Sequence, residues 1–234
     1  MVNNSSKNNL SKKKNQSFLR SSPIINRNYL PDQTINKIKY SFRDNNDFPS
    51  ISLINFFDKK IYFFIQKELS HLKLIHQKNP PLYSYSRSHL TKYLNSFFNR
   101  EDLRNFLAKI SERNVKKVDL SYSQFSHKDY MLLHDLVSKE EKDSTRYDLI
   151  FDLTPNWNKE WGGTIFYVDR LGNHHPILSY PNTLTLIERK IIKRKNNDFS
   201  SEDSAKLTYY LKYINQHAKN KKRLLIMGRI ITSK

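Results

Sequence analysis

The chain of 234 residues contains no cysteine, only 4 glycines and no long apolar run. Without cysteine it can form no disulfide, thiolate metal site or thiol nucleophile, so His, Asp and Glu are the remaining metal ligands. The few glycines build neither a Walker loop nor a dinucleotide fingerprint. No stretch of about 18 apolar residues could span a membrane. Residues 1–16 also lack the apolar core of a secretory signal, so we expect a soluble, cytoplasmic protein.

Acidic residues are also scarce relative to basic ones, and the formal net charge is +19. Such a balance is compatible with a polyanionic partner such as nucleic acid. The positive charge is spread along the chain, however, and no basic run is longer than Lys12–Lys14. A polyanion contact through a basic segment and a merely solvated basic surface both remain open at this point.

The composition divides the chain into two parts. Residues 1–45 are basic, rich in Asn and Ser and poor in periodic apolar positions, which predicts a disordered N-terminal arm. Residues 46–234 are expected to fold as one domain, which starts with a short apolar strand at Ile51–Phe56. Within this domain the polar and basic stretch from Glu188 to Lys206 predicts a surface loop.

Two helices are expected early in the domain. In Asp58–Gln77 the apolar positions recur at spacings of three and four, which gives one buried face, and Asp58 is a suitable N-cap. The Asn79-Pro80-Pro81 sequence should end this helix. The second helix is expected at Arg100–Arg113, with two acidic residues in its first turn, where the helix dipole favours them.

After Asn114 the apolar residues alternate with polar ones, which indicates strands. The 14 Tyr and 14 Phe also favour sheet over a helical bundle. About eight short strands after two helices predict a β-sandwich or jelly roll with the helices packed on one sheet. The expected strands are 118–122, 147–153, 164–168, 176–180, 183–187, 209–214 and 223–232, besides the one that ends at His134.

The residues most suggestive of chemistry lie in and after the segment from Asp129 to Gly163. They are Asp129-Tyr-Met-Leu-Leu-His134-Asp135, Arg146, Leu153-Thr-Pro-Asn-Trp157, Trp161-Gly162-Gly163 and, later, Pro181-Asn182. In this order and spacing the sequence resembles the prolyl hydroxylase-like branch of the 2-oxoglutarate/Fe(II)-dependent oxygenases, over about residues 46–234. The resemblance implies an α+β, mainly β fold with a double-stranded β-helix (jelly-roll) core. It also implies a hydroxylase of a protein, peptide or small-molecule side chain, with Fe(II) and 2-oxoglutarate as cofactors.

In such enzymes two His and one carboxylate hold one face of Fe(II) and leave the other face open. His134 matches the first His. The carboxylate belongs two residues later, where Leu136 stands, so the candidate is Asp135. Neighbours on a strand point to opposite faces, and Asp135 would therefore need a β-bulge to join His134. A rival pair, His127-Lys128-Asp129, has the correct spacing within a different register.

The resemblance places Tyr209 where the second His ligand belongs, and a phenolate favours Fe(III). His217 could replace it only if the strand were shifted by eight residues. Arg223 matches the arginine that pairs with the far carboxylate of 2-oxoglutarate, a task suited to a bidentate guanidinium. We therefore assign His134, Asp135 and His217 to the metal, and Arg223 and Tyr209 to the cofactor site.

Three functions are compatible with these residues. The first is an active hydroxylase, which requires a complete iron site. The second is a catalytically inactive binding or scaffold protein on the same barrel, which Leu136 and Tyr209 suggest. The third is a contact with nucleic acid or the ribosome through the basic arm and Lys193–Lys195, which could coexist with either of the others.

Overall fold

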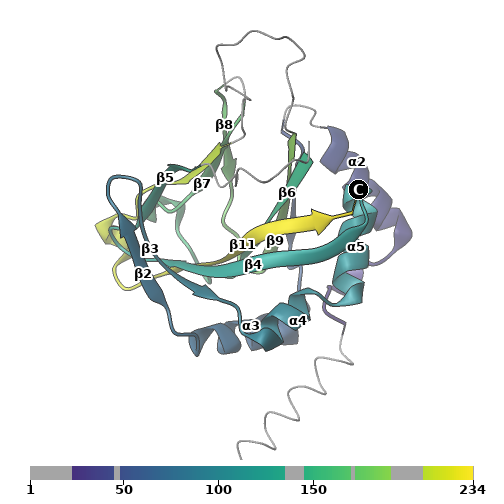
Figure 1. The fold of residues 1–234 in the computed structure, drawn as a ribbon, viewed down its shortest axis with the longest axis horizontal. Helices are drawn as coiled ribbons and strands as arrows, with labels where there is room; N and C mark the ends of the chain where they lie inside the picture. The colour runs from purple at the N-terminus through teal and green to yellow at the C-terminus, as the bar shows by residue number, and fades with distance from the viewer. Residues whose placement is uncertain (1–22, 45–47, 135–144, 170–171, 191–207, 234) are drawn as a thin grey trace, which may run out of the picture.

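The computed structural model describes residues 23–44, 48–134, 145–169, 172–190 and 208–233 (Figure 1). Its strands form one strongly curled antiparallel sheet in the order β1-β9-β6-β11-β4-β3-β5-β10-β7-β8, and β2 pairs with β3 outside this path. The predicted jelly roll, a double-stranded β-helix preceded by helices, is confirmed. No described helix has the length and apolar character needed to cross a membrane.

The elements have the following bounds. The strands are β1 Ser50–Ile54, β2 Ile75–Asn79, β3 Tyr83–His89, β4 Val115–Phe125, β5 Tyr130–His134, β6 Thr145–Asp152, β7 Ile165–Val168, β8 His174–Ile177, β9 Thr183–Lys190, β10 Thr208–Leu211 and β11 Arg223–Thr232. The helices are α2 Asp32–Asp44, α3 Lys59–Ser70, α4 Lys92–Phe98 and α5 Glu101–Ser111, with short 3-10 turns η1 Arg27–Tyr29, η2 Lys159–Trp161 and η3 Gln216–Ala218.

The sheet has two halves whose inner faces meet. One half contains β1, β9, β6, β11 and β4, and the other contains β5, β10, β7 and β8. Inner residues of the first half, such as Ile150 and Leu225, share one buried cluster with Met131, Tyr167 and Leu211 of the second. The alternation along each strand therefore divides its side chains between this barrel interior and the outer face.

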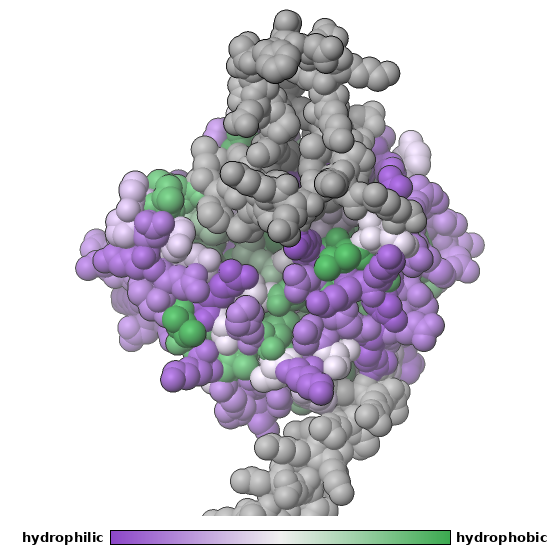
Figure 2. Space-filling model, viewed as in Figure 1, coloured by the Kyte–Doolittle hydropathy of each residue, from purple (hydrophilic) through white to green (hydrophobic). Residues whose placement is uncertain are grey.

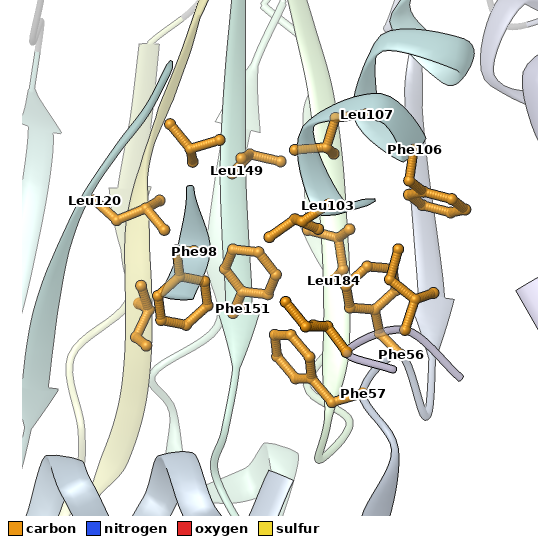
Figure 3. Packing of buried hydrophobic residues seen from close by; sticks show 14 of the residues in the cluster. Phe56, Phe57, Phe98, Leu103, Phe106, Leu107, Leu120, Leu149, Phe151 and Leu184 are labelled. Carbon is orange, nitrogen blue, oxygen red and sulfur yellow. The ribbon is translucent and has the colours of Figure 1, made fainter. Parts of the chain in front are cut away.

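The outer face of the larger half carries the helices. Apolar residues of α2, α3, α4 and α5 form one cluster with the outward residues of β4, β6, β9 and β11. At its centre Phe151 of β6 lies 5.2 Å from Phe98 and 5.3 Å from Phe57, measured between ring centroids (Figure 3). Leu103 and Leu107 of α5 complete this layer and are fully buried. The helices are thus held to the sheet by aromatic and leucine packing.

Two predictions about the N-terminal half are corrected. Residues 23–44, assigned to a disordered arm, contain η1 and the helix α2, in which Ile35, Ile38 and Phe42 are buried. Their spacing gives α2 one apolar face, which the surrounding Asn and Lys residues obscure in the sequence. The long helix expected over Asp58–Gln77 ends at Ser70, with Asp58 as its N-cap, and β2 follows. Residues 1–22 lie outside the described part.

Candidate functional site

The first site residues to consider lie where β5 ends and β10 begins. His134 and Tyr209 are direct partners in the antiparallel ladder between these two strands. The two positions that the resemblance assigns to histidine ligands are therefore adjacent in space. The side chain of His134 and all of Asp135 lie outside the described residues, as does Leu136.

A cavity of about 290 Å³ opens into the barrel beside Tyr209. One row of lining residues runs across three neighbouring strands. In the strand register, Arg229 of β11 lies opposite Asp119 of β4 on one side and Asp148 of β6 on the other. Farther along the same strands the lining becomes hydroxyl-bearing and then apolar. These lining residues are Ser121, Ser123, Phe125, Met131, Ile150 and Met227. The cavity is thus charged at one end and apolar at the other.

A buried ion pair lies at the charged end. Nε of Arg189, in β9, is 2.7 Å from Oδ2 of Asp148, and both side chains are almost fully buried. The Arg189 guanidinium also lies over the ring of Tyr209, 6.0 Å from its centroid, and that ring stacks on Tyr167. Burial lowers the pKa of Arg189, but Asp148, Tyr167 and Tyr209 together raise it by more, so the guanidinium stays charged.

Tyr167 joins the same cluster through its hydroxyl, which donates a hydrogen bond to Oδ2 of Asp148 at 3.0 Å. Burial and the nearby carboxylate raise the pKa of Tyr167 well above its usual value. The phenol of Tyr167 therefore stays protonated and donates to the Asp148 carboxylate. The charges of Asp148 and Arg189 are thus balanced within the protein.

A second buried ion pair lies deeper in the barrel. Arg223, at the start of β11, is 1% exposed and pairs through Nη1 with Oδ2 of Asp152. The same Nη1 donates to the hydroxyls of Thr154 and Ser179, and Nε donates to the carbonyl of Gly163 at 3.2 Å. The guanidinium also lies 5.6 Å from the centroid of the Trp157 ring. Arg223 is thus enclosed by protein groups.

The tight turn that supplies this carbonyl follows from its glycines. Gly162 and Gly163 both adopt positive φ, which glycine does without steric cost. A Cβ on Gly162 would lie 2.0 Å from the carbonyl oxygen of Tyr213, so only glycine fits there. Nε1 of Trp157 donates to the Gly162 carbonyl at 2.9 Å and fixes the indole against the turn. The turn therefore has an architectural role.

The remaining sequence candidates lie elsewhere. His217 is an exposed residue of η3, beyond the end of β10 opposite to Tyr209, so the structure does not bring it to His134. Asp129 of the rival His-x-Asp pair is buried. It accepts hydrogen bonds from Ser84 Oγ and the Ser126 amide, both at 2.8 Å, which gives it a structural role between β3 and β5.

The fit to the implied cofactors concerns the described residues alone, which include neither the side chain of His134 nor any part of Asp135. Among them, no group of three or more His, Asp or Glu side chains could hold a metal ion. At the position of the second histidine stands Tyr209, whose ring lies under the Arg189 guanidinium and which supplies no imidazole ligand. Arg223 is already neutralised by Asp152, so its charge is not available to a co-substrate carboxylate.

Sequence reasoning missed the acidic and basic partners that complete this site. Asp148 and Asp152 were visible as polar positions within an alternating strand, and Arg189 follows a buried strand. Alternation alone would have placed both aspartates on the inner face of β6, opposite to Leu149 and Phe151. A charged residue on an inward face is the signal that could have identified them.

Comparisons with known proteins agree with the fold. No protein-family model matches the chain. A stretch of 81 residues is 33% identical to prolyl 3-hydroxylase OGFOD1 of Xenopus laevis, and it covers 33% of this chain but only 15% of that protein. A prolyl-4-hydroxylase of Pseudomonas putida superposes with a TM-score of 0.61 at 10% identity, over 84% of this chain and 100% of the other.

A second solved structure has the same architecture. It is a prolyl hydroxylase of Trichoplax adhaerens in complex with a peptide fragment of a hypoxia inducible factor, with a TM-score of 0.58 at 11% identity, over 86% of this chain and 91% of the other. The chain therefore has the fold of the prolyl hydroxylase-like 2-oxoglutarate oxygenases, as the sequence resemblance implies.

Proposed function

We propose that this chain is a prolyl hydroxylase-like protein that receives a side chain of a protein, peptide or small molecule in the mouth of its barrel. The observation that carries the proposal is the cavity of about 290 Å³ between the two halves of the sheet. It is large enough to receive one side chain, and its lining combines charged and hydroxyl groups with apolar side chains that could orient such a group. The Trichoplax relative, which is solved with a peptide fragment, supports a peptide-sized occupant.

The function has two versions, which differ in whether the bound group is oxidised. A hydroxylase is supported by the fold, by the local similarity to prolyl 3-hydroxylase OGFOD1 and by the adjacency of His134 to Tyr209. It would require Fe(II) held by His134, Asp135 and a third ligand, with 2-oxoglutarate as co-substrate. In that version the cavity would position the target carbon beside the metal.

Binding without oxidation would be consistent with the two buried ion pairs, Asp148–Arg189 and Asp152–Arg223. Arg189 lies over Tyr209, which stands at the position of the second histidine, and Asp152 pairs with the arginine expected to bind a co-substrate carboxylate. A barrel of this kind would present its mouth to a partner and release it unchanged. These two ion pairs are the observation on which this second version rests, whereas the fold and the local similarity support the first.

One spectroscopic experiment separates the two versions. The full chain is incubated anaerobically with Fe(II) and 2-oxoglutarate, and the metal-to-ligand charge-transfer absorbance is recorded. Oxygen is then admitted and succinate is measured. Binding without oxidation predicts neither signal in a sample that circular dichroism shows to be folded. A charge-transfer band followed by succinate would establish the hydroxylase.

The location of the binding site is tested separately. Proline-containing peptides are screened for a rise in the melting temperature of the full chain, and each hit is repeated on Met227→Trp, which fills the cavity from its lining. Leu178→Trp, at a residue that is 58% exposed and not part of the lining, is the control. We expect the rise to disappear only in Met227→Trp. An equal rise in all three proteins would place binding outside the barrel.

A further inference from the structure

The environment of Arg223 has the form of a carboxylate-binding pocket. A guanidinium combined with hydroxyl groups binds a carboxylate through charge-assisted hydrogen bonds. Here the guanidinium belongs to Arg223, and the hydroxyl of Ser179 donates to Oδ2 of Asp152 at 2.8 Å. The amide of Thr154 donates to the other oxygen, Oδ1, at 3.0 Å. Both oxygens of one carboxylate are therefore bound, and that carboxylate comes from the chain itself.

The pocket is closed from the cavity side. The cavity reaches Ser123 and Phe125 of β4, which lie opposite to Leu225 and Arg223 in the ladder with β11. Neither Arg223 nor Asp152 is part of its lining, and Asp152 lies opposite to Leu225 on the other side of β11. Leu225 is fully buried between the two positions. An entering dicarboxylate would have to displace apolar side chains before it reached the guanidinium.

Charge balance gives a second reason why a carboxylate ligand is excluded from the pocket around Arg223. Asp152 and Arg223 are each almost completely buried and neutralise one another. A further carboxylate in this pocket would leave one negative charge uncompensated in a medium of low polarity, which is strongly unfavourable. A carboxylate ligand and Asp152 are therefore competitors for the same guanidinium, and Asp152 is permanently present.

We propose that Asp152 is a built-in carboxylate that takes the place of a carboxylate ligand at Arg223, so that this barrel does not accept 2-oxoglutarate there. The proposal goes beyond the proposed function, because it concerns the deep pocket and holds whether or not a partner occupies the mouth. It also makes a positive prediction: removal of the Asp152 side chain creates a site for a small free carboxylate, with Arg223, Thr154 and Ser179 as its donors.

The test compares the wild-type chain with Asp152→Ala and Asp152→Asn. The alanine variant removes the carboxylate and leaves space, whereas the asparagine variant removes the charge but keeps the volume. Melting temperatures are measured in sodium formate and in sodium chloride at equal ionic strength. We expect both variants to melt below wild type, and formate to raise the melting temperature of Asp152→Ala by a few degrees relative to chloride. Asp152→Asn and wild type should not respond.

A calorimetric titration of the wild-type chain with 2-oxoglutarate completes the test and does not depend on the folding of any variant. No heat of binding is expected. Binding of 2-oxoglutarate to wild type, or an equal response of the alanine and asparagine variants to formate, would overturn the proposal. Loss of peptide binding at the barrel mouth would contradict the proposed function alone, so the two failures are distinguishable.

Discussion

At the scale of single residues, the barrel interior depends on charges that are balanced within the protein. Asp148 faces Arg189 and also accepts the hydroxyl of Tyr167. Removing one member of a buried pair leaves the other without compensation, and this typically costs about 3–5 kcal/mol. Breaking the Asp148–Arg189 pair is therefore destabilising, although replacing both residues by well-packed apolar ones need not be.

This argument predicts that Asp148→Ala lowers the free energy of unfolding by about 3–5 kcal/mol, measured by chemical denaturation. Asp119→Ala is the matched control, because Asp119 lies in the same row of the cavity but is exposed. Its substitution should change stability by less than about 0.5 kcal/mol. Equal losses in the two variants would show that burial of the Asp148 charge is not the cause.

A buried tyrosine provides a second prediction at this scale. Burial raises the pKa of Tyr122 to about 12. The unfolded chain has an ordinary phenol that ionises near pH 10, so above that pH the unfolded state loses its proton first. The contribution of Tyr122 to stability is therefore complete below about pH 10 and is lost as the pH rises toward about 12.

Denaturant unfolding at about pH 9 and about pH 11 tests this sign. Stability should fall more between the two conditions in the wild-type chain than in Tyr122→Phe, which has no ionisable hydroxyl at that position. An identical fall in the two proteins would mean that Tyr122 ionises as readily in the folded state as in the unfolded one.

At the scale of elements, the helices and the sheet are joined by the aromatic cluster around Phe151 (Figure 3). Phe151→Ala should reduce the free energy of unfolding by about 3–5 kcal/mol, because it removes a fully buried ring and leaves a cavity. Phe63→Ala, in α3 at 55% exposure, is the control and should change it by less than about 0.5 kcal/mol. Comparable losses would place the contact between helices and sheet elsewhere.

The elements that sequence reasoning found are those with a regular apolar period. Strands β4, β6 and β11 alternate because one face meets the helices and the other lines the barrel. The hairpin of β2 and β3 was missed because its side chains are mostly polar and only partly buried, so no apolar period marks it. Helix α4 was missed because its seven residues are too few to establish a period.

The candidate site could be predicted only in part, because its polar contacts join residues that lie far apart in the sequence. Similarity placed Arg223 in the barrel and His134 beside Tyr209, because those positions follow from the order of the strands. The pairing of Arg223 with Asp152 joins residues 71 positions apart, and no local pattern encodes such a contact. It becomes visible only when β6 and β11 are placed side by side.

At the scale of the whole molecule, the excess of positive charge is the property that the barrel does not explain. The net charge is +19, and the face in view in Figure 2 is largely hydrophilic, with only small apolar patches. An excess of positive charge favours contact with polyanions, which release counterions on binding, and this is independent of what the barrel binds. The proposal that the basic N-terminal segment contacts nucleic acid follows from this charge.

The last prediction concerns this segment. Residues 1–22 include Lys12–Lys14 and precede the described part of the chain, so they can be deleted without removing any described residue. We expect the full chain to bind a labelled RNA of about 20 nucleotides with an affinity that falls steeply with salt, and the chain without residues 1–22 to show a shallower slope of log affinity on log salt. Lys116→Gln, an exposed change on β4, is the control and should alter the slope by about one unit or less.

A slope near zero for the full chain would remove the polyanion contact altogether. A slope that the deletion leaves unchanged would assign the contact to the folded domain, because counterion release counts only the cations that touch the phosphates.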